Sequence, residues 1–291
     1  SLKGKTKVML LSATLCDKSD DFLVFGYMLN FYETLKKGRN WIQGIIREDR
    51  NKFGHESSLS KHIFPEKGSK MSLEDLGTKI PQNIISVECY TLKKKYIDKI
   101  NKEYSNIKNI LEGKKNISHL TKILRSRQKI EEYKVPILSE LANKYLEQGK
   151  SVVLFVNFLY TLDLLKKILD MNYIEYSCIY GGQTIEEREL NIEDFQSNVK
   201  KIILAMIQTG GESISLHDID GKHPRVSIIS PSMSSIELVQ VLGRIYRTGV
   251  KSPVLQKIVF CDDTYENNIC QIIKNKINFL NKLTDDDLIN F

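Results

Sequence analysis

Two arginines and a glutamine near the C-terminal end form the pattern with the clearest chemistry. Gln240, Arg244 and Arg247 are four and three residues apart, so a helix would project all three from one face. Two guanidinium groups fixed on one face can hold separated phosphate oxygens and stabilise charge on a transferring phosphoryl group. Gly243 would let another backbone or a nucleotide approach closely. A solvated basic helix end is the alternative, and the spacing after a capped helix favours phosphate binding.

A second candidate is the glycine pair of Thr209-Gly210-Gly211-Glu212, which follows an apolar run at 200–207. Paired glycines at the end of a buried strand suit a loop that presents backbone amides to a phosphate. A plain strand-to-helix turn is the alternative. The position of the pair before the arginine pattern favours the phosphate-binding interpretation.

The N-terminal segment contains two short patterns that chance also produces. Ser12-Ala13-Thr14 follows an apolar run, and hydroxyl groups at a strand end can bridge hydrogen bonds between two lobes. Gly4-Lys5-Thr6 copies the end of a phosphate-binding loop, but that loop must open a helix and the next residues predict a strand. No other Gly-Lys-Ser/Thr and no acidic Mg²⁺ box occurs, so the sequence has candidate arginine fingers without a nucleotide-holding loop of its own.

Two further segments could face a nucleic acid. The loop from Tyr180 to Thr184 offers exposed amides at a helix start, which can bind a nucleic-acid backbone, although a capped turn without a ligand fits equally well. The run Lys93-Lys94-Lys95 is interleaved with tyrosines in a basic helical stretch. A solvated surface is the favoured interpretation of that run.

Composition limits the classes of protein to which the chain can belong. It has 291 residues, of which 41% are hydrophobic and 27% are charged, with a formal charge of +7, which permits a polyanionic partner without requiring one. The longest apolar runs are too short to cross a bilayer, and no signal peptide is recognisable. None of the five cysteines forms a CxxC pair, so we expect no metal site and an intracellular, reducing compartment such as cytoplasm, nucleus, or a viral factory or virion.

The elements that must position these residues alternate between strand and helix in the C-terminal half. Apolar runs separated by amphipathic stretches predict a parallel sheet covered on both faces, with functional residues on the loops after the strands. Capping boxes are predicted at Thr184 with Glu187 and at Ser234 with Glu237. Strands are predicted at 6–11, 84–90, 151–156, 173–179, 200–207, 225–229 and 255–260, and helices at 20–36, 92–111, 118–133, 135–148, 159–171, 184–195, 234–245 and 264–283.

Taken in chain order, these motifs resemble the second half of a superfamily 2 helicase, and most closely the Swi/Snf-type DNA-dependent ATPases. The resemblance covers almost the whole chain, and the last motif is the most specific. The segments that resemble motifs III and IV, the following family block, and motifs V and VI are 11–14, 154–158, 182–184, 209–216 and 240–247. Ile207 and Ser213 depart from the Thr and Gly that are frequent in motif V.

The resemblance implies an α/β fold, namely a RecA-like three-layer parallel sheet with helices on both faces and additional helical N-terminal segments. It divides the chain into a remnant of the first RecA-like lobe at 1–80, a helical linker or insertion at 81–134, and the second RecA-like lobe at 135–291. It further implies that ATP and Mg²⁺ are held mainly by a first lobe that lies outside this sequence, and that this lobe is a partner within the same polypeptide.

The resemblance also assigns roles to individual residues. Arg244 and Arg247 would contact the γ-phosphate of ATP with support from Gln240, and no residue would bind a metal. The remaining assignments are the nucleotide neighbours Gly211, Glu212 and Gly243, the nucleic-acid contacts Asn157, Phe158, Gly182 and Gln183, and the lobe-coupling residues Ser12, Ala13 and Thr14.

We therefore expect the C-terminal half of an ATP-dependent helicase or translocase that acts on nucleic acid, with DNA favoured over RNA and no membrane partner. The chain alone is predicted to be inactive in ATP hydrolysis. The alternative is a non-catalytic nucleic-acid-binding module that uses the basic helices at 92–133. A Rossmann-like transferase is a weaker third reading, because the glycine fingerprint and the acidic ribose partner are both missing.

Overall fold

The computed structural model describes residues 9–10, 19–53, 59–64, 67–69, 81–113, 117–210, 214–231 and 235–283. The chain divides into two compact units. One comprises Ser1–Thr78 with Asn275–Leu288, and the other comprises Lys79–Lys274 with Ile289–Phe291. Within the described residues, no helix has both the length and the apolar character needed to cross a bilayer.

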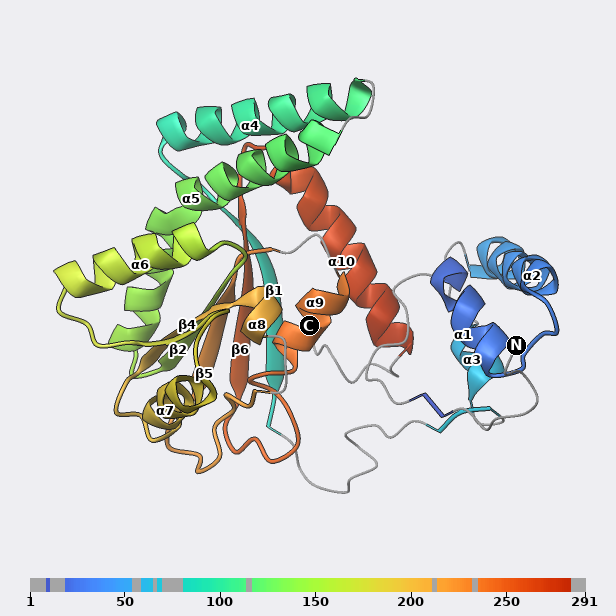
Figure 1. Cartoon of the computed structure of the whole chain (residues 1–291). Coiled ribbons are helices and arrows are strands. Elements are labelled where there is room, and N and C mark those ends of the chain that lie inside the picture. Colours follow the sequence, from blue (N-terminus) through green and yellow to red (C-terminus); the bar gives the residue numbers. More distant parts are fainter. Residues whose placement is uncertain are drawn as a thin grey trace. The chain divides into compact units, whose positions relative to one another are not determined.

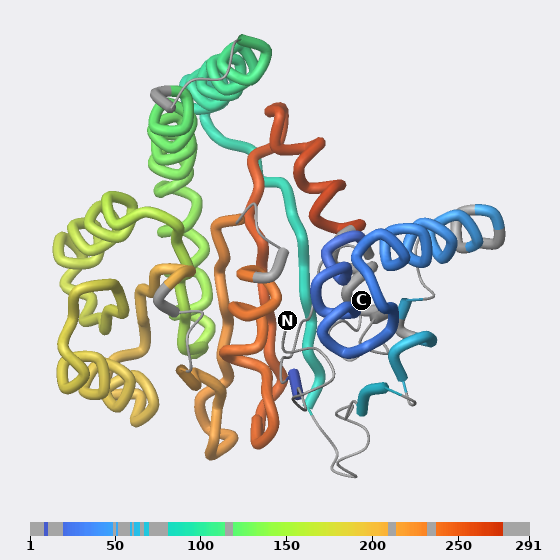
Figure 2. Tube along the Cα trace, turned by 45° about the vertical axis from the view of Figure 1, so that its right-hand side comes forward, coloured from blue at the N-terminus to red at the C-terminus, as the bar shows by residue number. Residues whose placement is uncertain are grey.

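The larger unit is built on a six-stranded sheet in which every pairing is parallel, in the order β1-β6-β5-β2-β4-β3 (Figures 1 and 2). The central strands are near-continuous apolar runs, as expected of strands that are covered on both faces. The strands are β1 (Asn83–Tyr90), β2 (Ser151–Val156), β3 (Ser177–Ile179), β4 (Ile202–Met206), β5 (Arg225–Ile229) and β6 (Val254–Cys261).

Helices cover both faces of this sheet, so the predicted three-layer α/β architecture is confirmed. Helices α5 (Ile117–Glu147) and α6 (Leu159–Met171) pack on the face that carries alternate β2 residues such as Val152 and Leu154. The opposite face is contacted by α7 (Ile185–Gln196) and α9 (Ser235–Leu242). Arg225 Nη2 donates to Phe195 O of α7 at 3.3 Å, and Gln256 Nε2 donates to Leu242 O of α9 at 3.1 Å.

Three further helices complete the larger unit. Helix α4 (Lys94–Glu112) packs antiparallel against the first part of α5, and the short α8 (Ile207–Gly210) follows β4 directly. Helix α10 (Glu266–Leu283) begins after β6 and continues beyond Lys274, the boundary between the units. Because all strands are parallel, the loops that follow them meet at one edge of the sheet, and α4 and α5 lie over that edge (Figure 1).

The predicted break between helices at 133 and 135 is wrong, because α5 runs through Pro136 without interruption. Proline removes one backbone donor from a helix and usually kinks or ends it. Here Pro136 is exposed, whereas its neighbours Val135, Ile137 and Leu138 are buried in the core. Packing of the flanking residues therefore outweighs the local cost of the proline.

The smaller unit contains a short 3-10 helix (Ser19–Asp21) and the helices α1 (Phe22–Met28), α2 (Leu35–Phe53) and α3 (Leu59–Ile63). The helix predicted at 20–36 is therefore wrong in its second half. Asn30 has a φ of 61°, a left-handed conformation that ends α1, and the next helix passes through Gly38 instead of stopping before it. The ring of Tyr32 is packed against both helices, and its hydroxyl donates to Leu23 O at 2.6 Å.

Several element ends differ from prediction by a few residues. Strand β3 begins only at Ser177, because Tyr173 has a φ of 55° and closes a turn after α6. Helix α9 ends at Leu242 and does not reach Ile245. The capping box of Thr184 and Glu187 is confirmed, whereas Ser234 lies outside the described residues. Of the strand predicted at 6–11 only residues 9 and 10 are described, and neither is in a strand.

Candidate nucleotide and nucleic-acid site

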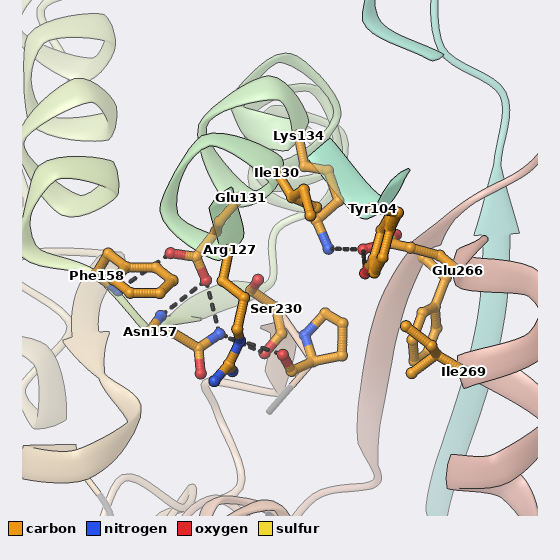
Figure 3. Close-up of a pocket in the computed structure, with 12 residues that line it drawn as sticks. Tyr104, Arg127, Ile130, Glu131, Lys134, Asn157, Phe158, Ser230, Glu266 and Ile269 are labelled. Carbon is orange, nitrogen blue, oxygen red and sulfur yellow. Dashed lines mark hydrogen bonds and ion pairs between the residues drawn. The ribbon is translucent and has the colours of Figure 1, made fainter. Parts of the chain in front are cut away.

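The loop that follows β2 is held by a buried carboxylate from α5. Glu131 is 3% exposed, and its Oε1 accepts from Asn157 N at 2.8 Å and from Asn157 Nδ2 at 2.7 Å. Its Oε2 accepts from Phe158 N at 3.1 Å. Phe158 precedes the first turn of α6 and has no side-chain cap, so Glu131 places its negative charge at a helix N-terminus, where the charge is stabilised (Figure 3).

The side-chain amide of Asn157 also reaches the loop after β5. Asn157 Nδ2 donates to Pro231 O at 3.3 Å and lies 3.5 Å from Ser230 O. The amide group of this predicted nucleic-acid residue is therefore used to join the carboxyl ends of β2 and β5 to α5. Asn157 and Phe158 both line a cavity of about 40 Å³ at this edge, together with Arg127 of α5 (Figure 3).

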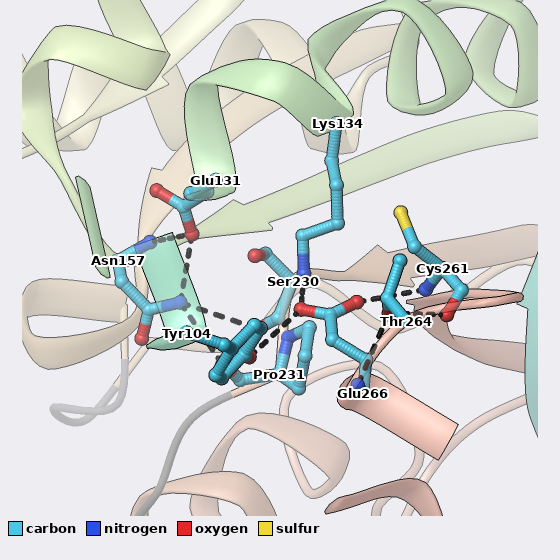
Figure 4. A network of polar contacts seen from close by, with 9 residues as sticks. All are labelled: Tyr104, Glu131, Lys134, Asn157, Ser230, Pro231, Cys261, Thr264 and Glu266. Carbon is cyan, nitrogen blue, oxygen red and sulfur yellow. Dashed lines mark hydrogen bonds and ion pairs between the residues drawn. The ribbon is translucent and has the colours of Figure 1, made fainter. Parts of the chain in front are cut away.

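A buried ion pair forms the other side of this cavity. Lys134 Nζ lies 2.8 Å from Glu266 Oε1, and the two side chains are 3% and 2% exposed. Glu266 also accepts from Tyr104 OH at 3.2 Å and from Cys261 N at 2.7 Å (Figure 4). Burial alone would lower the pKa of Lys134, but Glu266, together with Cys261 and Glu131, outweighs burial and the pKa is raised. The pair joins α5 to the start of α10.

The loop after β3 is closed by the side chain of Gln183. Gln183 Oε1 accepts from Tyr180 N at 2.9 Å, and its Nε2 donates to Cys178 O at 3.1 Å. Gly182 has a φ of +93°, a left-handed conformation that favours glycine. Both predicted nucleic-acid residues thus shape the turn, and Gly182 is exposed on it.

The two arginines do not share a helical face, because α9 ends at Leu242 and both follow it. That part of the sequence argument is wrong, yet the structure brings them together by another route. Arg244 Nη1 donates to Ile214 O at 3.2 Å, and Arg247 Nη1 donates to Ser215 Oγ. The backbone of Arg244 is fixed as well, since its carbonyl accepts from Leu216 N at 2.9 Å. The segment at 214–216 therefore anchors both guanidinium groups.

Positive charge is concentrated around this segment. The pKa of Arg244 is lowered by burial and by the neighbouring Arg247 guanidinium. The pKa of His217 is lowered by burial and then by Arg247 and Arg225. Neighbouring cations that lower the pKa of Arg244 and of His217 create a site at which an anion would be stabilised.

The comparison with family models matches residues 133–249 to a family described as the helicase conserved C-terminal domain. Residues 133–249 carry a helicase conserved C-terminal domain. The matched segment contains the Asn157 loop, the Gln183 turn and both arginines of the helicase domain.

Relatives of this helicase domain include viral and chromatin proteins. The chain is 35% identical over 304 residues to protein L364 of Acanthamoeba polyphaga mimivirus. The name of that protein describes it as an ATP-dependent RNA helicase. The match covers 97% of the chain and 55% of that protein, so the chain spans about half its length. It is also 30% identical over 140 residues to the human SWI/SNF-related matrix-associated actin-dependent regulator of chromatin subfamily A member 1, covering 47% of the chain and 13% of the relative.

Among solved structures, the Sulfolobus solfataricus SWI2/SNF2 ATPase core domain aligns with 89% of this chain and 57% of its own length. The TM-score is 0.53 at 18% sequence identity. This likeness supports a RecA-like fold for the helicase domain.

The remaining predicted site residues either lie outside the described residues or make no contact that supports the predicted role. Gly211 and Glu212, with the hydroxyl motif Ser12, Ala13 and Thr14, lie outside the described residues. Gln240 is exposed on α9. At Gly243 an added Cβ would meet Gln240 O at 3.5 Å, an ordinary contact, so the described structure does not require glycine there.

Metal ligands were not expected in this sequence, and the structure offers no cluster of three or more His, Cys, Asp or Glu side chains suited to a metal ion within its described part. The guanidinium pair, by contrast, suits an anionic phosphate group.

Sequence reasoning missed the three charged residues that organise the edge of the sheet, namely Glu131, Lys134 and Glu266. A signal was available in α5. Ile130, Lys134 and Leu138 are four residues apart, so the lysine occupies an inward position of an apolar stripe. A charged residue at such a position requires a buried partner, although the sequence does not say which one.

Proposed function

We propose that this helicase domain works in an ATP-dependent DNA translocase, in which an upstream lobe holds ATP with Mg²⁺ and Arg244 and Arg247 reach the γ-phosphate. The observation that carries the proposal is the anchoring of both guanidinium groups on residues 214 and 215, which lie within the segment at 209–216 that resembles motif V. These contacts join the segments that resemble motifs V and VI, which are far apart in sequence.

The anchoring suits the role of an arginine finger. Each arginine spends one Nη1 group on the protein, which restricts its side chain before any ligand arrives. Burial and then the neighbouring Arg247 charge lower the pKa of Arg244, and an anion bound there would offset both. Closing two lobes around ATP would bring such charges to the phosphate, and repeated closure and opening would step the domain along a strand.

The nucleic-acid partner is inferred from the family and from the loop edge. The names of relatives include a chromatin remodelling factor, a regulator of chromatin and an RNA helicase, and DNA is favoured because chromatin contains DNA. We place the track at the loops of Asn157–Phe158 and Gly182–Gln183, which follow β2 and β3 at the same edge of the sheet. Because Asn157 and Gln183 hold their loops in shape, their effect on nucleic acid would be exerted mainly through backbone groups.

The proposal is tested by ATP hydrolysis in two polypeptides, the 291-residue chain and a longer protein that includes the upstream lobe. We expect no turnover by the chain alone, and turnover by the longer protein that duplex DNA stimulates. Turnover by the chain alone would contradict the division of roles between the lobes. Stimulation by RNA but not by DNA would replace DNA with RNA as the track.

One observation favours the second candidate, a non-catalytic nucleic-acid-binding module. The helices α4 and α5 carry many exposed lysines and arginines, including Lys94, Lys102 and Arg125. Such a module would bind nucleic acid equally well with and without ATP. It would also be indifferent to replacement of Arg244 and Arg247 in the longer protein.

A further inference from the structure

The positive charge of the chain is concentrated on one helical hairpin. Residues 93–129, which we call the basic arm, comprise α4, the connection to α5 and the first part of α5. They contain twelve lysines and arginines against three acidic residues, a net charge of +9, whereas the whole chain carries +7. All other residues together are therefore slightly acidic, and a polyanion would be directed to the arm.

Few of these cations are neutralised within the protein. Lys129 pairs with the buried Glu103 at 3.1 Å, and Lys108 lies 3.9 Å from Glu112. Lys99 lies over the Tyr133 ring at 5.2 Å, a contact that leaves its charge in place. Within the described part of the chain no ion pair is formed by the exposed Lys93, Lys94, Lys102, Lys122 and Arg125.

The arm meets the helicase site at Arg127. This half-buried arginine lines the cavity that Asn157 and Phe158 also line (Figure 3). Four charged side chains line the cavity, and three of them have partners: Glu131 accepts three N–H groups, and Lys134 and Glu266 pair with each other. No hydrogen bond or ion pair from the Arg127 guanidinium occurs among the described residues, so its N–H groups are available to a phosphate, while the four charges that line the cavity sum to zero.

We propose that the basic arm binds the phosphate backbone of a nucleic acid, with Arg127 as the contact that connects the arm to the loop of Asn157 and Phe158. The proposal rests on the proposed function for the class of its partner. It extends the proposed track from the loops after β2 and β3 to the basic arm.

The spacing of the cations favours a long polyanion over a compact one. Lys94 and Lys108 stand fourteen positions apart on one helix, a span of about 21 Å at 1.5 Å per residue. A nucleic-acid strand presents a phosphate about every 3.4 Å of duplex length, so several phosphates would lie along the cations of α4. The Phe158 ring beside Arg127 adds an aromatic surface of the kind on which bases stack. An acidic peptide would match the charge but has no use for that ring.

The test compares two triple variants of the 291-residue chain that lose the same charge. The first is Lys122→Gln with Arg125→Gln and Arg127→Gln. The matched control is Lys201→Gln with Lys222→Gln and Lys251→Gln, three exposed lysines just before β4, β5 and β6, at the opposite edge of the sheet. Binding of labelled duplex DNA, and separately of labelled RNA, is measured without nucleotide at several salt concentrations.

We expect the arm variant to bind DNA or RNA at least about tenfold more weakly at ~50 mM salt. The plot of the log association constant against log salt should become less steep by roughly 2 to 3. The control should stay within about twofold of the unmodified chain. Equal weakening in both variants would overturn the proposal, as would labelled polyglutamate that binds as tightly as nucleic acid and is lost with the same arm variant.

Single substitutions guard against misfolding of the triple variant. Arg127→Lys keeps the charge and should retain most of the binding, whereas Arg127→Gln should lose severalfold and lower the salt slope by about 1. Identical binding by these two variants would refute the role of Arg127. Because no ATP is present, this outcome is independent of whether Arg244 and Arg247 act on ATP.

Discussion

At the scale of single residues, the paired arginines are positioned by their neighbours and not by helical periodicity. Arg244 and Arg247 follow the end of α9 and are fixed by Ile214 and Ser215. Nearby, His217 is half-buried and feels the same positive charge. Its titration therefore reports on the field of the proposed phosphate site.

Replacing Arg247 with alanine should raise the pKa of His217. Burial would still hold this pKa down, but the second largest cause, the Arg247 charge, would be gone. Titration followed by NMR of the imidazole protons measures the change. Arg125→Ala on the distant face of α5 is the control and should leave the pKa of His217 unaltered. No difference between the two variants would show that Arg247 points away from this site.

Removing one member of the buried ion pair of Lys134 and Glu266 should strongly lower the free energy of unfolding. Lys134→Met leaves the Glu266 carboxylate buried without its cation, and we expect a loss of about 3 to 5 kcal/mol in the free energy of unfolding. The double variant Lys134→Met with Glu266→Gln should lose clearly less, because the uncompensated charge is removed. Urea denaturation followed by circular dichroism measures both. If the loss in the double variant equals the sum of the losses in Lys134→Met and in Glu266→Gln measured separately, the two groups do not interact.

At the scale of elements, apolar runs predicted the strands well, because a strand covered on both faces has few polar positions. Strand β5 was predicted at its observed bounds, and the bounds of helix α6 were also correct. The errors arose where packing overrides local preference. Pro136 continues a helix since its neighbours are buried, and the helices on either side of Asn30 are separated by the packing of Tyr32, which no local pattern reveals.

Two glycines of α2 should respond in opposite ways to alanine. A Cβ at Gly38 would lie 2.3 Å from Tyr32 Cε2, and Tyr32 is 8% exposed and cannot easily move, so Gly38→Ala should cost about 1 to 3 kcal/mol. Gly44 has nothing within 4 Å of such a Cβ, so Gly44→Ala should stabilise by roughly 0.5 to 1 kcal/mol. Fluorescence of the single tryptophan, Trp41, which packs on Tyr32 at 5.8 Å, follows unfolding of this unit. A Gly38→Ala variant that is as stable as the Gly44→Ala variant would contradict the packing described for Tyr32.

The contact between strands β1 and β6 should depend on pH. Burial raises the pKa of Glu88, but hydrogen bonds from Lys257, Ser86 and Tyr90 outweigh it and lower the pKa to about 2. A lowered carboxyl pKa adds stability above the unfolded value near 4.5, and that stability is lost as pH falls from there to about 2.

Lys257→Met should therefore lower stability at neutral pH, and its deficit should shrink as pH falls from about 4.5 to about 2. Urea midpoints across this range measure the deficit. Lys201→Met, which removes an exposed lysine without an ion pair in the described structure, is the control. A deficit for Lys257→Met that stays constant with pH would rule out the assigned link to Glu88.

At the scale of the whole molecule, the order of motifs along the sequence was sufficient to predict the helicase domain and its parallel sheet. The site was only partly predictable. The sequence placed Asn157 and Gln183 on the loops that follow β2 and β3, where the structure also has them. Their side chains, however, turn inward to Glu131 and to Cys178. The partners that fix them come from distant segments, so a local motif cannot reveal them. The division into 1–80, 81–134 and 135–291 stays a prediction, although β1 pairs with β6 within the larger unit.

The most direct test of the central claim is ATP turnover by the longer protein after Arg247→Ala, with Lys222→Ala as a control at the opposite edge of the sheet. The account predicts that kcat with DNA falls by at least about 1,000-fold, the lower end of the range expected of an arginine finger, while DNA binding without nucleotide is retained. The control should turn over ATP at the unmodified rate. A normal kcat for Arg247→Ala would contradict the claim that this guanidinium acts on the phosphate of ATP.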